Sequence, residues 1–176
     1  MTRTMVFIDG SNLYHSLRER YGRTDIDFAK LCNYLANGRE LVRGYYYNAT
    51  VDQGREEARY GDQQRFFDRL RRVPKLEVRL GTLVYPQAWP QAPPYEKGID
   101  VRVATDMLTH AFRGNYDVAI LVSGDNDFAD ALQAVKDLGR NVEVALFGNA
   151  NSSRRLRDVA DDTISLEPPG LASCWL

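Results

Sequence analysis

The sequence predicts an α/β fold of three layers, in which helices cover both faces of a mainly parallel sheet. Short runs of β-branched and other apolar residues alternate with longer segments that repeat apolar residues at helical spacing. The chain has 176 residues, enough for one domain with its own core, and we find neither an internal repeat nor a dividing linker. Strands separated by helices favour a parallel sheet with right-handed crossovers.

The first half of the chain predicts three strands and three helices. Residues 5–9, 41–47 and 76–84 are apolar or rich in β-formers, as expected of strands. Helices are expected where apolar residues recur three or four positions apart, at 13–21, 28–36 and 53–73. The second has Asp25 or Asp27 as its cap, and Pro74 ends the third. Residues 85–95 form a proline-rich connection.

The second half continues the alternation. We expect helices at 100–112, 127–138 and 152–160 and strands at 117–122 and 141–147, with a further edge strand at 163–166. Gly139 follows the middle helix, as is common after a helix end. We place the domain at residues 1–167, and Pro168-Pro169-Gly170 predicts a frayed C-terminal tail over 168–176.

Composition excludes several classes of site. The formal net charge is −1, so the chain lacks the basic character of a protein that grips long duplexes. Two cysteines without a spacing motif and only two histidines exclude a zinc cluster or a histidine-rich centre. The longest strongly apolar run, 118–122, is too short to span a bilayer, and no signal peptide precedes Asp9. We therefore expect a cytoplasmic protein.

Acidic residues stand where two strands end. Asp9 closes the first strand, and Asp125 follows the strand at 117–122. Asp100 and Asp127 each open a helix, where an acid alone is explained by capping. Because the carboxyl ends of parallel strands share one edge, we expect the four carboxylates to converge there. Their mutual repulsion favours a hard divalent ion, Mg²⁺ or Mn²⁺.

Other motifs that would explain an α/β sheet are absent from the sequence. A phosphatase of the haloacid type needs a second aspartate at position 11, which is Ser11, and a metal-dependent adhesion site needs serine at position 13, which is Leu13. No phosphate-binding loop ending in Lys-Ser or Lys-Thr occurs, and no Gly-x-Gly-x-x-Gly follows the first strand.

Three segments in order resemble the signatures of the NYN domain, a branch of the PIN-like nucleases that includes the LabA-like bacterial proteins. They are Asp9-Gly10-Ser11-Asn12-Leu13, Lys97-Gly98-Ile99-Asp100-Val101 and Ser123-Gly124-Asp125-Asn126-Asp127-Phe128. The resemblance covers nearly the whole chain. It implies a three-layer, Rossmann-like PIN fold and metal-dependent cleavage of RNA to a 5′-phosphate and a 3′-hydroxyl. Carried over by motif, Asp9, Asp100, Asp125 and Asp127 would hold the metal.

Substrate contacts are predicted around these acids. Asn12 would orient a carboxylate or touch a phosphate, and Ser123 and Lys97 lie within the same motifs. Ser152 and Arg154 open the last helix and suit a phosphate, although a capped, solvated helix explains them equally well. Trp89 and Tyr95 would stack on unpaired bases or simply cover the sheet edge.

Further residues have structural interpretations. The three tyrosines at 45–47 are expected in the core, and Asp106 is expected to pair with Arg102 one turn earlier. Asp130, one turn beyond Asp127, would join the outer shell of the acidic site.

Three functions follow from these observations. The first is a metal-dependent ribonuclease acting on single-stranded or structured RNA. The second is a regulatory RNA- or protein-binding module with little turnover, which the near-neutral charge favours. The third is a phosphatase or nuclease acting on small nucleotides or DNA. A homo-oligomer would lengthen the substrate face of a compact nuclease, but no residue demonstrates one.

Overall fold

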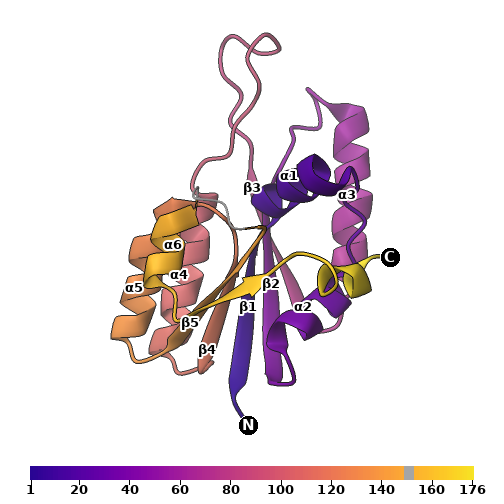
Figure 1. Ribbon diagram of the computed structural model, residues 1–176. Coiled ribbons are helices and arrows are strands. Elements are labelled where there is room, and N and C mark those ends of the chain that lie inside the picture. Colours follow the sequence, from indigo (N-terminus) through magenta and orange to yellow (C-terminus); the bar gives the residue numbers. More distant parts are fainter. Residues whose placement is uncertain (149–152) are drawn as a thin grey trace.

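The computed structural model describes residues 1–148 and 153–176, which form one sheet of six parallel strands covered by helices (Figure 1). The strands are β1 (Arg3–Asp9), β2 (Glu40–Thr50), β3 (Leu76–Thr82), β4 (Val118–Val122), β5 (Asn141–Leu146) and β6 (Asp162–Ser165). Their order is β3-β2-β1-β4-β5-β6. The chain thus builds the sheet outward from β1 in both directions, and the order reverses between β1 and β4.

Helices cover the two faces separately, which confirms the predicted three-layer α/β/α fold class (Figure 1). The helices α1 (Gly10–Tyr21), α2 (Phe28–Ala36) and α3 (Glu57–Leu70) lie on one face. The other face carries α4 (Ile99–Phe112), α5 (Ala129–Asp137) and α6 (Arg154–Val159). In the part of the chain described, no helix is long and apolar enough to cross a membrane.

Two apolar cores lie against the sheet, one on each face. The five residues of β4 are all buried, as expected of a strand covered on both sides. The predicted packing of the three tyrosines of β2 is confirmed, because Tyr45 and Tyr47 fill one core and Tyr46 the other. Tyr45 stacks on Phe7 of β1 with 5.6 Å between ring centres.

The bounds of one strand and two helices differ from the prediction. The third strand ends at Thr82, and Val84 then pairs with Tyr95 in an antiparallel bridge, so that residues 83–98 rise from the sheet as a hairpin-like loop (Figure 1). The helix expected from residue 53 begins at Glu57. The helix expected from Asp127 begins as a short 3-10 helix, η1 (Asn126–Phe128), and continues as α5.

The predicted frayed tail is wrong. Residues Leu171–Cys174 form a short 3-10 helix, η3, whose Leu171 and Cys174 are fully buried in the core beside α2. Trp175 then pairs with Ile26 across an antiparallel bridge and packs edge-on against Tyr21. The apolar side chains after Pro168-Pro169-Gly170 therefore order the segment that the turn residues predicted to be loose.

Candidate functional site

Strands β1 and β4 bring the first two predicted acids to one place. They are neighbours at the point where the strand order reverses, and Ile8 pairs with Val122, so that Asp9 and Ser123 come next in their chain segments. The Ser123 hydroxyl donates a hydrogen bond to Oδ2 of Asp9 across this junction, at 3.2 Å. The carboxyl edge at such a reversal is where open α/β sheets bind ligands.

Asp9 is held from two sides. Its Oδ1 accepts a hydrogen bond from the Asn12 amide at 3.1 Å, which caps α1, while its Oδ2 accepts from Ser123. Burial raises the pKa of Asp9 above its ordinary value; the hydrogen bonds oppose the rise, and the charges of Asp125 and Asp100 add to it. Asp9 is therefore an acid kept in a place that disfavours its charge.

Gly10 makes this placement of Asp9 sterically feasible. A Cβ at position 10 would lie 2.5 Å from the Tyr46 hydroxyl oxygen and 2.6 Å from the Tyr47 carbonyl oxygen. Only glycine lets α1 start this close to β2.

Asn12, in the first turn of α1, joins the start of this helix to the loop after β4. Its Oδ1 accepts a hydrogen bond from the Gly124 amide at 3.0 Å, and the Ser153 hydroxyl donates to the Gly124 carbonyl at 2.8 Å. Ser123 Oγ also accepts from the Asp125 amide at 3.2 Å. The two predicted polar residues, Asn12 and Ser123, thus position the acidic loop in this structure.

Asp125 and Asp127 lie on the exposed side of that loop. Oδ1 of Asp125 accepts from the Asp127 amide at 2.9 Å and caps η1, so the capping role expected of Asp127 belongs to Asp125. The charge of Asp125 adds to the rise that burial causes in the pKa of Asp9. Asp127 is exposed at the same edge of the sheet.

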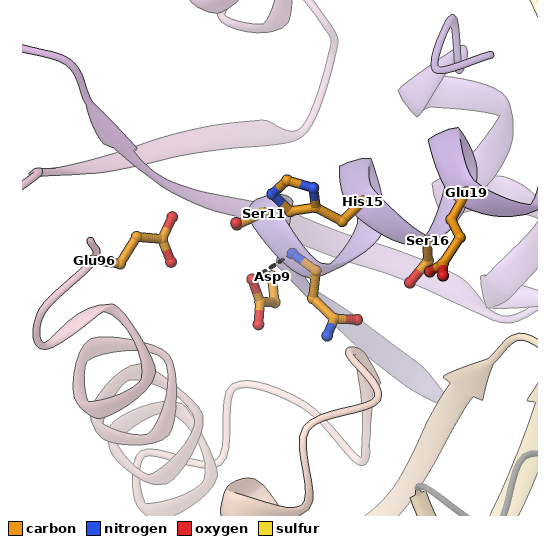
Figure 2. A pocket seen from close by; sticks show the side chains of 7 residues that line it. Asp9, Ser11, His15, Ser16, Glu19 and Glu96 are labelled. Atoms are coloured by element: carbon orange, nitrogen blue, oxygen red, sulfur yellow. Dashed lines mark hydrogen bonds between the residues drawn. The ribbon is translucent and has the colours of Figure 1, made fainter. Parts of the chain in front are cut away.

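Asp100 reaches the site from the opposite side, in the first turn of α4. Glu96, four residues before Asp100, also lies at the site, and the sequence analysis did not predict it. Burial raises the pKa of Glu96, and the charges of Asp9 and Asp100 raise it further, while a hydrogen bond with Ser11 opposes the rise. Figure 2 shows the Glu96 carboxylate turned toward Asp9. The only sequence signal for Glu96 is its position immediately before the Lys97–Val101 motif.

A hollow opens beside Asp9 between these groups and runs along α1 (Figure 2). Its lining is polar throughout and consists of Asp9, Ser11, Asn12, His15, Ser16, Glu19 and Glu96.

The donor set suits a hard divalent ion. All candidate ligands are carboxylate, hydroxyl or amide oxygens. Burial and, after it, neighbouring carboxylates raise the pKa of Asp9 and Glu96, and a cation would favour the charged form of both groups. Within residues 1–148 and 153–176, no three acidic, histidine or cysteine side chains stand close enough to enclose an ion as they are. Binding through one or two carboxylates and several waters, which is usual for Mg²⁺, is compatible with that spacing.

The remaining predicted contacts lie farther out. Lys97 is exposed. Arg154 is 81% exposed and pairs with Asp158 on its own helix at 3.8 Å. This agrees with the solvated helix that was the predicted alternative to phosphate binding. Ser152 falls outside the described residues. Asp130 is 96% exposed and pairs with Arg155 at 3.5 Å.

Two aromatic side chains of the 83–98 loop differ in their surroundings. Tyr95 is 52% exposed. Trp89 packs edge-on against Tyr85, and the Arg55 guanidinium lies over both rings.

The predicted Arg102–Asp106 ion pair is wrong. Asp106 accepts a hydrogen bond from the Tyr47 hydroxyl at 2.9 Å, and Arg102 donates instead to the Leu80 carbonyl. A partner from the sheet replaces the expected neighbour on the helix.

A three-layer parallel fold with acids gathered at its strand reversal defines the class of protein, an α/β domain with a polar, acid-lined site. The NYN domain model matches residues 3–167, and the chain belongs to the NYN domain family. The low amplitude and bright protein LabA of Synechococcus elongatus is 26% identical over 175 residues, covering 94% of this chain and 84% of LabA.

Two solved structures are similar to different degrees. A protein of unknown function from Vibrio parahaemolyticus shares the fold, with a TM-score of 0.71, 23% identity and coverage of 99% of this chain and 96% of its own. The flap endonuclease of bacteriophage T5, in a complex with DNA and metal ions, gives a TM-score of 0.38 at 16% identity over 70% of this chain and 49% of its own. The second likeness is too low to carry an inference.

Proposed function

We propose that this protein is a metal-dependent ribonuclease that hydrolyses RNA phosphodiester bonds at Asp9, Asp100, Asp125 and Asp127. The observation that carries the proposal is the convergence of acids from three segments on the half-buried Asp9. Ser123 donates a hydrogen bond to Asp9 and accepts one from the Asp125 amide, and the charges of Asp125 and Asp100 add to the rise that burial causes in the pKa of Asp9. Membership of the NYN family supports the same reaction class. A cytoplasmic location is part of the proposal, and the two free cysteines, Cys32 and Cys174, suit a reducing compartment.

The roles of the residues follow from their contacts. Asp9, Asp100, Asp125 and Asp127, together with Glu96, would hold Mg²⁺ or Mn²⁺, which when bound lowers the pKa of a water and neutralises charge on the phosphate. Asn12 and Ser123 fix the Asp9 and Asp125 loops relative to each other, so that these carboxylates need little reorganisation. Ser153 supports the same loop from α6 through the Gly124 carbonyl.

The test is cleavage of an end-labelled RNA of mixed structure with Mn²⁺, Mg²⁺ or EDTA. Wild-type protein should cut only with metal, and Asp125→Asn should lose at least a hundredfold in rate with an unchanged melting curve. Asp68→Asn is the matched control, because that carboxylate is 62% exposed on α3 and pairs only with Arg71 in the described residues. Metal-dependent cutting that survives in Asp125→Asn would refute the assignment.

A binding module with little turnover is the second candidate. It is favoured by the absence of a ready-made ligand cluster among residues 1–148 and 153–176 and by the lack of lysine and arginine in the hollow. RNA binding without cleavage under any metal, equal in wild type and Asp125→Asn, would establish this function in place of the first.

A further inference from the structure

The hollow beside Asp9 continues along one stripe of α1. Ser11, His15 and Glu19 are spaced four residues apart and line it together with Ser16. At a rise of about 1.5 Å per residue, this stripe runs roughly 12 Å from the acids toward the C-terminal end of the helix. Figure 2 shows His15, Ser16 and Glu19 following one another along α1 away from Asp9. We call this surface the α1 groove.

The chemistry of the α1 groove favours hydrogen-bond donors over phosphates. Neither lysine nor arginine lines it, and Glu19, Glu96 and Asp9 give it a negative charge that repels a phosphate in the absence of a cation. Carboxylate and hydroxyl oxygens accept hydrogen bonds from hydroxyl groups. Within the described residues, the Glu19 and Ser16 side chains have neither hydrogen-bond nor ion-pair partners, so their acceptor oxygens are free.

An aromatic side chain flanks the groove. Tyr14 is 42% exposed and meets the His15 ring edge-on, with 5.4 Å between ring centres. An exposed ring beside a row of acceptors suits a nucleotide, since its base can stack while its sugar hydroxyl donates.

We propose that the α1 groove reads the ribose 2′-hydroxyl of an unpaired RNA strand, with Glu19 and Ser16 as acceptors, and thereby distinguishes RNA from DNA. This rests on the proposed nuclease function and names the substrate feature that the same site selects. DNA lacks the donor, so it would leave the Glu19 carboxylate without the hydrogen bond that RNA supplies. Glu19 and Ser16 are specificity-determining residues in this view and take no part in bond cleavage.

The experiment compares a labelled single-stranded RNA with DNA of the same sequence. The ratio of kcat/KM for RNA to that for DNA should fall about tenfold in Glu19→Gln and less in Ser16→Ala, because hydrogen bonds to charged groups are the stronger ones. Glu40→Gln is the control, since that exposed glutamate begins β2 at the opposite edge of the sheet. An unchanged ratio in Glu19→Gln, or a wild type without preference for RNA, would overturn the proposal.

Binding separates this proposal from the proposed function. The affinities of Asp125→Asn for the same RNA and DNA are measured with and without Glu19→Gln. One outcome is that the wild type cleaves no RNA, while its binding preference for RNA over DNA still depends on Glu19. The nuclease function is then refuted, and the proposed role of the α1 groove is retained. If RNA is cleaved and the binding preference does not depend on Glu19, the nuclease stands and the α1 groove is refuted.

Discussion

Replacement of Gly10 by alanine should damage fold and site together, because position 10 has no room for a methyl group. The added Cβ would lie 2.6 Å from the Tyr47 carbonyl oxygen, about 0.4 Å inside the 3.0 Å that real Cβ contacts respect. Neither neighbour yields easily: one is backbone of the central strand β2, and Tyr46 is buried and packed edge-on against Phe28. The β1–α1 turn itself must therefore move.

The expected cost is that of overpacking a core, about 2 kcal/mol. For a chain of 176 residues this lowers the melting temperature by about 4–8 °C. The same movement displaces Asp9, so cleavage should fall at least tenfold even where the protein is fully folded. Thermal unfolding followed by circular dichroism measures the first effect, and RNA cleavage at 20 °C the second.

Gly61→Ala is the matched control. Position 61 lies inside α3, and its nearest atom to an added Cβ is on the flexible Arg65 side chain at 3.6 Å. The same substitution should there stabilise the protein by about 0.5–1 kcal/mol, since alanine favours a helix interior. If Gly10→Ala and Gly61→Ala changed stability equally, or Gly10→Ala kept wild-type cleavage, the steric account of the β1–α1 turn would be refuted.

Three further predictions concern charge, a buried hydrogen bond and the C-terminus. Burial raises the pKa of Glu96 above its ordinary 4.5, so the folded state binds a proton more tightly than the unfolded state does. The stability of the folded state therefore falls as pH rises through the folded pKa. Glu96→Gln should raise the melting temperature of metal-free protein at pH 7.5 and leave it unchanged at pH 4. Tyr47→Phe removes a buried donor to Asp106 and should cost about 1.5–3 kcal/mol in urea unfolding; a loss under 0.5 kcal/mol would deny the hydrogen bond a structural role. Leu171→Ala should lower the free energy of unfolding by about 2–5 kcal/mol. Leu176→Ala, which changes a side chain that is 78% exposed, should lower it by under about 0.5 kcal/mol. Equal effects would show that the C-terminal segment is frayed after all.

Residue periodicity was sufficient to predict the sheet and its helices, because apolar spacing reports which side of an element is buried. Asp9 and Asp125 were predictable for a related reason, since a strand's end fixes the edge on which its last side chain lies. Asp100 was included because it opens a helix, and the family motif supported that choice, although no local pattern encodes its distance from the first acid.

Predictions failed where contacts between distant segments decide the outcome. Glu96 follows directly after the Val84–Tyr95 bridge, where the 83–98 loop returns toward the sheet and the charge of Asp9 acts on Glu96. Turn-forming residues suggested a loose C-terminus, but buried Leu171 and Cys174 order it. Helical spacing alone suggested an ion pair for Asp106, whose actual partner is a tyrosine on β2.

The sheet holds one side of the site and the 83–98 loop holds the other. Mutations on the two sides should therefore have different effects. Asp9 and Asp125 follow adjacent central strands and are tied through Ser123. Glu96 instead lies near the end of the long 83–98 loop, and Asp100 follows it. Tyr85 fastens this loop to the β2–α3 connection by donating to Glu56 at 2.5 Å and accepting from the Asp52 amide at 2.9 Å.

Releasing that anchor with Tyr85→Phe leaves both strands intact. It should therefore weaken metal binding and raise the metal concentration needed for cleavage, with little change in melting temperature. A large loss of stability without a shift in metal dependence would show that the anchor serves the fold rather than the site.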